Sequence, residues 1–169
     1  YGIRYILRQR SDKAKEGDLI AWGAYGLPVW EEADGIIQAF ADIQKRHTRK
    51  GWFGNYLDHE IYDFSPYEEE SMKRKGTNVV KLAEKMARDI YRENHSVVWA
   101  LHGTETGLHV HFIVNTVNFM DGNKRHENKI RTRQREKRFQ AIVERELQKP
   151  VDPEGLFKTW DEGPIAATA

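Results

Sequence analysis

Three of the seven histidines in this 169-residue chain fall within ten positions, at His102, His109 and His111. Between His109 and Asn115 apolar residues occupy every second position, a period that is typical of a half-buried strand. Side chains two positions apart on a strand point the same way and lie roughly 7 Å apart. We therefore expect His109 and His111 to project from one face of a sheet while the alternating apolar side chains enter a core.

A second strand is expected just before these histidines, because residues 96–101 are mostly β-branched, aromatic or aliphatic. A turn-like segment with Gly103 and Gly107 at its ends separates the two stretches. An antiparallel hairpin would bring His102 back beside His109 and His111. Three neutral imidazoles commonly hold a divalent transition metal and leave positions open for water or substrate, which predicts a catalytic metal site. The alternative is a set of polar histidines on a sheet surface.

Composition narrows the possible functions. The length suits one compact domain, and the 27 Lys and Arg residues against 26 Asp and Glu give a net charge of +1, so only an uneven distribution of charge could indicate nucleic acid. The chain has no cysteine, which excludes disulfides, zinc ribbons and thiol nucleophiles and fits a reducing compartment. No apolar run approaches the roughly 20 residues that a membrane span needs.

The remaining pattern predicts the elements that position the histidines. Helices are expected over residues 31–46, 78–92 and the stretch that ends before Pro150, and further strands near 20–22 and 56–64. Hairpins and long helices alternate without a βαβ rhythm. This order predicts an α+β sandwich, in which helices cover one face of an antiparallel sheet. We expect one domain over residues 1–150, followed by a tail or the start of a linker over residues 151–169.

A nucleophile has to be sought among the tyrosines or in water, because the chain has no serine motif, no cysteine and no Gly-rich phosphate loop. Tyr5 is the best candidate, since Arg4 and Arg8 beside it could orient a phosphate. A free phenol ionises near pH 10 and needs a metal, a base or a nearby cation to attack. The alternatives are metal-activated water as the nucleophile and a Tyr5 that only packs in the core or at its rim.

Two further groups are candidates for roles around the site. Glu60, in the expected strand 56–64, could accept a hydrogen bond from a ligand imidazole and fix its tautomer, or it is a solvated carboxylate. His59, on the other parity of that strand, is interpreted as a residue that does not bind the metal.

The run from residue 124 to 138 is strongly basic and predicts contacts with a phosphate backbone, unless it is only a solvated helix face. Its candidate DNA-binding residues are Lys124, Arg125, Lys129, Arg131 and Arg133, and the candidates for stacking on bases are Trp22, Tyr25, Trp30 and Trp52.

Several short motifs in chain order carry a resemblance to a known family. They are RYILR at residues 4–8, GAYGLPVW at 23–30, DHEIYDFSP at 58–66, and the stretch from 101 to 115 with its spaced first histidine and HxH pair. In these motifs the chain resembles the nuclease domain of conjugative relaxases, in the mobilisation-protein branch of the HUH endonuclease superfamily. The motifs cover most of residues 1–124, and the histidine motif is the most specific of them.

The resemblance implies a fold, a reaction and partners. It implies a roughly five-stranded antiparallel sheet, Mg²⁺ or Mn²⁺ on the three histidines, Glu60 as the carboxylate that orients them, and Tyr5, or Tyr1 in its place, as the nucleophile. In such enzymes the tyrosine attacks single-stranded DNA at a transfer origin and forms a reversible 5′-phosphotyrosine and a free 3′-hydroxyl. Implied partners are origin hairpin DNA, accessory relaxosome proteins and a coupling protein, in the bacterial cytoplasm. The alternatives are a rolling-circle replication initiator, a single-tyrosine transposase or a metal-binding module without catalysis.

Overall fold

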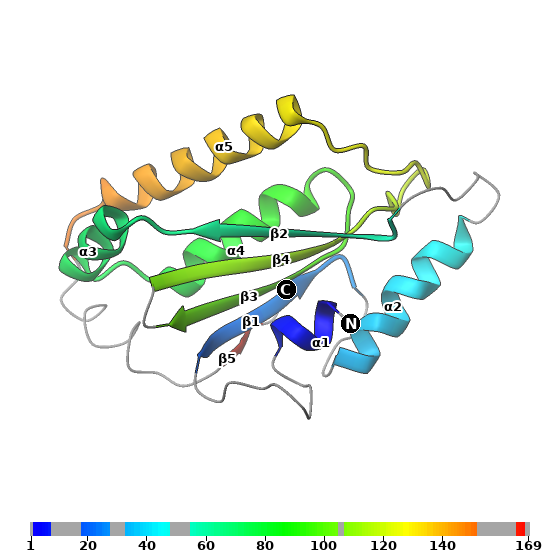
Figure 1. The fold of residues 1–169 in the computed structure, drawn as a ribbon, viewed down its shortest axis with the longest axis horizontal. Coiled ribbons are helices and arrows are strands. Elements are labelled where there is room, and N and C mark those ends of the chain that lie inside the picture. Colours follow the sequence, from blue (N-terminus) through cyan, green and yellow to red (C-terminus); the bar gives the residue numbers. More distant parts are fainter. Residues whose placement is uncertain are drawn as a thin grey trace.

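The structure is a computed structural model that describes residues 2–7, 18–27, 33–47, 55–104, 107–151 and 165–167. Figure 1 shows one sheet with helices around it. In chain order the elements are α1 (Gly2–Ile6), β1 (Leu19–Tyr25), α2 (Ala33–Arg46), β2 (Leu57–Asp63), α3 (Pro66–Lys75), α4 (Val79–Tyr91), β3 (Val97–Thr104), β4 (Gly107–Asn115), α5 (Lys129–Leu147) and β5 (Ile165–Ala167). The predicted α+β class, with helices packed on an antiparallel sheet, is confirmed.

The strands of this sheet lie in the order β2-β4-β3-β1-β5. Strands β2, β4, β3 and β1 pair antiparallel, whereas the three residues of β5 pair in parallel with the outer edge of β1. The expectation of five antiparallel strands is therefore corrected to four. The fifth strand comes from residues 165–167, in the segment that the sequence analysis had taken for a tail or linker.

Helices cover both faces of the sheet, and not one face as the sequence predicted. On one face α4 and α5 bury Leu82, Met86 and Phe139 against Val110 and other alternate residues of the strands. On the opposite face α1 and α2 pack against the strand residues of the other parity and form a second core. Its members include Ile3, Ile6, Ile36, Phe40, Val98, Ala100 and Ile113. Strand β3 lies between both cores, which explains why Val97–Leu101 read as an unbroken apolar run.

Local signals at the helix ends account for most of the boundaries. Asn78 caps α4, and its side chain accepts a hydrogen bond from the backbone N–H of Lys81 at 3.1 Å. Helix α3 was not predicted, although Ser65 and Glu68 form a capping box around its first turn. That spacing was the available signal. Among the described helices, none combines the length and the apolar character that a membrane span requires.

Candidate metal and nucleophile site

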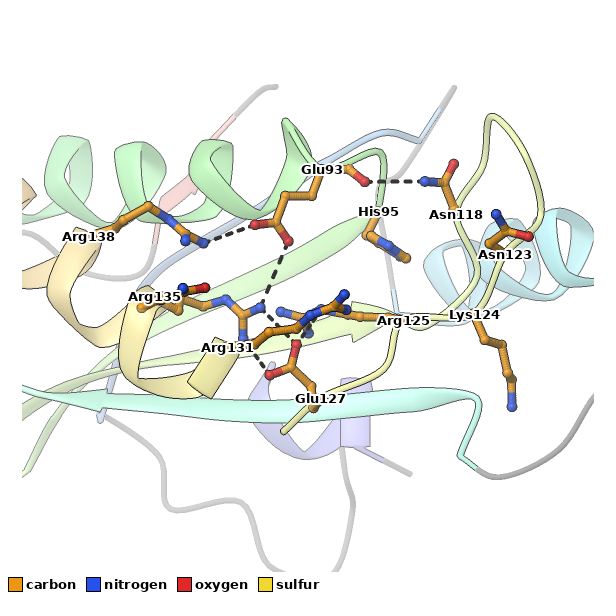
Figure 2. A pocket seen from close by; sticks show the side chains of 11 residues that line it. Glu93, His95, Asn118, Asn123, Lys124, Arg125, Glu127, Arg131, Arg135 and Arg138 are labelled. Carbon is orange, nitrogen blue, oxygen red and sulfur yellow. Dashed lines mark hydrogen bonds and ion pairs between the residues drawn. The ribbon is translucent and has the colours of Figure 1, made fainter. Parts of the chain in front are cut away.

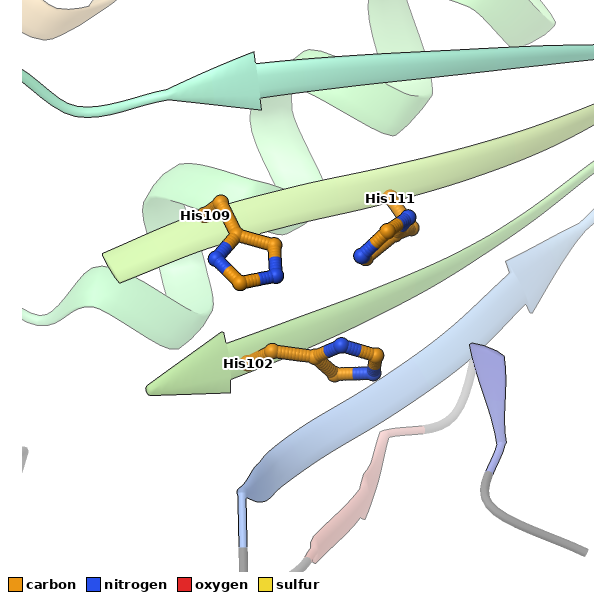
Figure 3. A group of neighbouring side chains, drawn as sticks. All are labelled: His102, His109 and His111. Carbon is orange, nitrogen blue, oxygen red and sulfur yellow. The ribbon is translucent and has the colours of Figure 1, made fainter. Parts of the chain in front are cut away.

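The β3–β4 hairpin gathers the three histidines on the face that carries α1 and α2. His102 lies directly across from His109 in the strand register, and His111 is two positions further along β4 on the same face. The ring centroid of His102 is 5.4 Å from that of His109 and 4.5 Å from that of His111. One ligand nitrogen from each ring lies within 4.8 Å of the others, and Figure 3 shows the rings turned toward one another.

The tautomer of His102 suits a metal ligand. Its Nε2 lies 2.7 Å from the backbone carbonyl oxygen of Ile6, in α1. A carbonyl can only accept, so Nε2 carries the hydrogen and Nδ1 is the nitrogen that holds a lone pair. A metal-bound histidine usually donates its other ring N–H to a carbonyl or carboxylate in this way, which fixes the tautomer and the orientation of the ring. The three histidines therefore form a cluster able to bind a metal.

Tyr5 lies beside this cluster, where the sequence analysis had placed the nucleophile. Its ring is 6.2 Å from the ring of His111, centroid to centroid, and meets it edge-on at 84°. The residue is 40 % exposed, so a substrate can approach it. It belongs to α1, and the next residue, Ile6, supplies the carbonyl that His102 contacts. The helix that carries Tyr5 is thus attached directly to one of the candidate ligands. Tyr1, the alternative nucleophile, lies outside the described residues.

The prediction for Glu60 is wrong, because β2 presents the other parity to the cluster. Strand β2 pairs with β4 so that Ile61 lies opposite His111 and Glu60 lies opposite Phe112, whose side chain enters the core on the other face. The residues of this strand on the histidine side are Leu57, His59, Ile61 and Asp63. Among them His59 contacts the cluster, since its Nε2 lies 2.8 Å from Nδ1 of His111. His59 was interpreted as a residue that does not bind the metal because it lies on the other parity of the strand from Glu60. Which parity faces the histidines depends on the register between two strands, a non-local property that a single strand does not reveal.

Glu60 takes part in an ionic network under α5 on the opposite face. Its carboxylate pairs with Arg125 at 2.8 Å and with Arg135, whose side chains are 3 % and 6 % exposed. Glu127 accepts a hydrogen bond from Arg135 at 2.9 Å. Burial raises the pKa of Glu127, but hydrogen bonding and the charges of both arginines outweigh it, and the net shift is downward. Arg138 pairs with Asp89 and with Glu93, each at 3.0 Å. Arg138 and Glu93 also line a cavity of about 370 Å³ (Figure 2).

This network corrects the prediction that Arg125 binds DNA. Its guanidinium is buried and faces three carboxylates, those of Asp58, Glu60 and Glu127, which fix it inside the protein. A buried, paired arginine is not available to a phosphate on the surface. The neighbouring Lys124 has a different position, since its ammonium lies 5.1 Å from the ring centroid of Tyr56.

The other candidate contacts with DNA are divided between the two faces. Arg4 lies beside Tyr5 on the histidine side and forms an exposed ion pair with Asp34. Lys129, Arg131 and Arg133 are exposed along α5, on the opposite side of the sheet. Arg8 lies outside the described residues. Of the stacking candidates, Trp22 and Tyr25 are buried, at 8 % and 7 % exposure, which removes them as surfaces for bases; Trp30 and Trp52 also lie outside the described residues.

Comparison with known proteins identifies a family for this chain. A family model described as "Relaxase: MobA/VirD2-like, nuclease domain" matches residues 5–148. The match includes Tyr5 and the three clustered histidines. No curated protein matches the chain.

Proposed function

The chain belongs to the relaxase family, as a nuclease domain of the MobA/VirD2-like type, and on that basis we propose that it nicks and rejoins single-stranded DNA at a transfer origin by tyrosine transesterification. The domain would extend over residues 1–150 and start conjugative transfer from the origin hairpin, together with accessory proteins and a coupling protein. The observation that carries the proposal is the position of Tyr5. Its ring centroid lies 6.2 Å from that of His111, and it belongs to α1, in which the backbone carbonyl of Ile6 contacts His102.

The three histidines would hold Mg²⁺ or Mn²⁺. When bound there, such an ion draws electron density from a phosphate oxygen and stabilises the charge that develops on it. The imidazoles suit this role because each offers one ligand nitrogen and these nitrogens lie within 4.8 Å of one another.

Tyr5 would supply the nucleophile. Its phenolic oxygen loses a proton and forms a bond to the scissile phosphorus, while the bond from phosphorus to the 3′ oxygen breaks and that oxygen takes up a proton. The products are a 5′-phosphotyrosine and a 3′-hydroxyl, and the reverse steps rejoin the strand. Arg4, one residue away, would help to position the phosphate on the same face.

The test is a search for the covalent intermediate. Single strands labelled at the 3′ end, drawn from a pool of random sequence, are incubated with the protein and Mn²⁺ and separated on a denaturing gel. We expect label on the protein band, its loss with Tyr5→Phe, and its retention with Tyr67→Phe, a control for an exposed tyrosine on α3. Cleavage by Tyr5→Phe without an adduct would identify water as the nucleophile, and an adduct lost only with Tyr1→Phe would assign the role to Tyr1.

A further inference from the structure

His59 lies against the candidate ligand His111, although it is not one of the three clustered histidines. Strand β2 places its side chain on the histidine face, two positions before Ile61, which lies opposite His111 in the register. The two ring centroids are 5.0 Å apart, and Nε2 of His59 is 2.8 Å from Nδ1 of His111. This distance is that of a hydrogen bond between two imidazole nitrogens.

Such a bond permits only two proton arrangements between neutral rings. If His59 donates, Nδ1 of His111 accepts and Nε2 of His111 must carry the hydrogen, so that ring has no second lone pair to offer. If His59 accepts, Nδ1 of His111 carries the hydrogen and its Nε2 lone pair is available. Figure 3 shows the other end of the His111 ring turned toward His102 and His109. Only the arrangement in which His59 accepts lets His111 act as a ligand through that end.

We propose, building on the metal site of the proposed function, that His59 is a positioning residue that selects the metal-binding tautomer of His111 and holds its ring in place. Carboxylates and carbonyls commonly fill this role beside metal-bound histidines. Here Ile6 fills it with a carbonyl for His102, and His59 fills it with an imidazole for His111.

The first experiment measures Mn²⁺ affinity by calorimetry in two variants of His59. His59→Phe keeps a ring but removes the acceptor, and we expect it to weaken Mn²⁺ binding by roughly 10–100-fold, the usual effect of losing such a partner. His59→Gln places an amide oxygen near the position of Nε2, and we expect it to bind within about threefold of the unmodified chain, because its acceptor is retained. His126→Phe, at an exposed histidine before α5, is the matched control and should leave the affinity unchanged.

The outcomes separate a positioning role from its rivals. Equal Mn²⁺ affinity in the unmodified chain and His59→Phe would overturn the proposal. Equal losses in His59→Phe and His59→Gln would overturn it too, because they would make the imidazole itself necessary, as for a fourth ligand. Thermal unfolding of each variant shows whether the edge strand β2 keeps its packing.

A second experiment tests the tautomer without any metal. Nitrogen-15 NMR of the imidazole side chains distinguishes a protonated Nδ1 from a protonated Nε2. We expect Nδ1 of His111 to be protonated in the unmodified chain and the balance to move toward Nε2 in His59→Phe. A His111 that carries its hydrogen on Nε2 in the unmodified chain would overturn the proposal. If the unmodified chain binds no Mn²⁺, the proposed function fails, and this measurement still decides the role of His59.

Discussion

On one face of the sheet three imidazoles turn toward one another, while on the other face arginines and carboxylates alternate. The arginine face is matched within itself, since Arg125, Arg135 and Arg138 each pair with at least one carboxylate. The histidine face gathers three imidazoles, and one ligand nitrogen of each lies within 4.8 Å of the others. Arginines and carboxylates that pair with one another hold parts of the fold together. Three imidazoles offer nitrogen ligands without a positive charge among them, and a metal cation would complete such a cluster. This contrast is the reason why we propose that the chemistry takes place on the histidine face.

The largest effect is expected from removing a ligand. His109→Ala and His102→Ala should each weaken Mn²⁺ binding by more than the roughly 10–100-fold that loss of an outer partner brings. The covalent adduct should fall below detection in both variants, and it should disappear from the unmodified chain in EDTA and return with Mn²⁺. Calorimetry and the gel assay make these measurements, with His126→Ala as the control. Unchanged Mn²⁺ affinity in both variants would remove the basis of the comparison.

On the arginine face the largest effect should fall on stability. Arg135→Met removes one of the two buried arginines that pair with Glu60 and Glu127, and leaves Arg125 as their partner. Because the lost hydrogen bonds are to charged groups, the substitution should cost about 1.5–3 kcal/mol of unfolding free energy. Arg138→Met is the matched control, because that guanidinium is 39 % exposed, and its loss should cost less than about 1 kcal/mol. Urea unfolding measures both. Mn²⁺ affinity should stay unchanged in folded Arg135→Met, and a large loss of metal binding there would show that the two faces are coupled.

Exposed cations on α5 should affect DNA binding without affecting the chemistry. Lys129→Gln and Arg133→Gln should each flatten the dependence of log affinity on log salt by about 0.7 for a single strand and about 0.9 for a duplex arm. These residues lie across the sheet from Tyr5, so a long strand or hairpin should show the effect and a short strand at the nick should not. Lys81→Gln, which removes one exposed charge from α4, is the control. Identical salt slopes in all variants would leave α5 as a solvated helix face.

The histidine site was predictable because its geometry is local. Strand periodicity fixed which side His109 and His111 share, and a short hairpin fixed where His102 returns. Glu60 and Arg125 could not be placed in this way, because their positions depend on how β2 aligns with β4 and on which carboxylates meet below α5. In β2 neither parity is purely apolar, so its sequence does not reveal which side faces a core. Helix α3 was missed although its capping box is visible in the sequence.

The smallest effect concerns His95, the histidine that lies on the arginine face. It is 6 % exposed, and its Nδ1 lies 2.8 Å from the backbone oxygen of Asn115. Burial lowers the pKa of His95 below the ordinary value of 6.5, although the contact with Asn115 opposes the shift. Above that value neither the folded nor the unfolded chain binds this proton. Below it the unfolded chain binds the proton first, so the free energy of unfolding decreases as the pH falls toward the folded pKa and then levels off.

His95→Asn removes this titration and keeps an amide that can donate to the same carbonyl. We expect urea unfolding at pH 7.5 and at pH 5.5 to show a smaller loss of stability in this variant than in the unmodified chain. His126→Asn, at an exposed position, should leave the loss unchanged. Equal pH dependence in His95→Asn and the unmodified chain would mean that other groups carry the acid sensitivity. A smaller loss would show that a solitary buried histidine on the matched face affects only stability, whereas the clustered histidines affect chemistry.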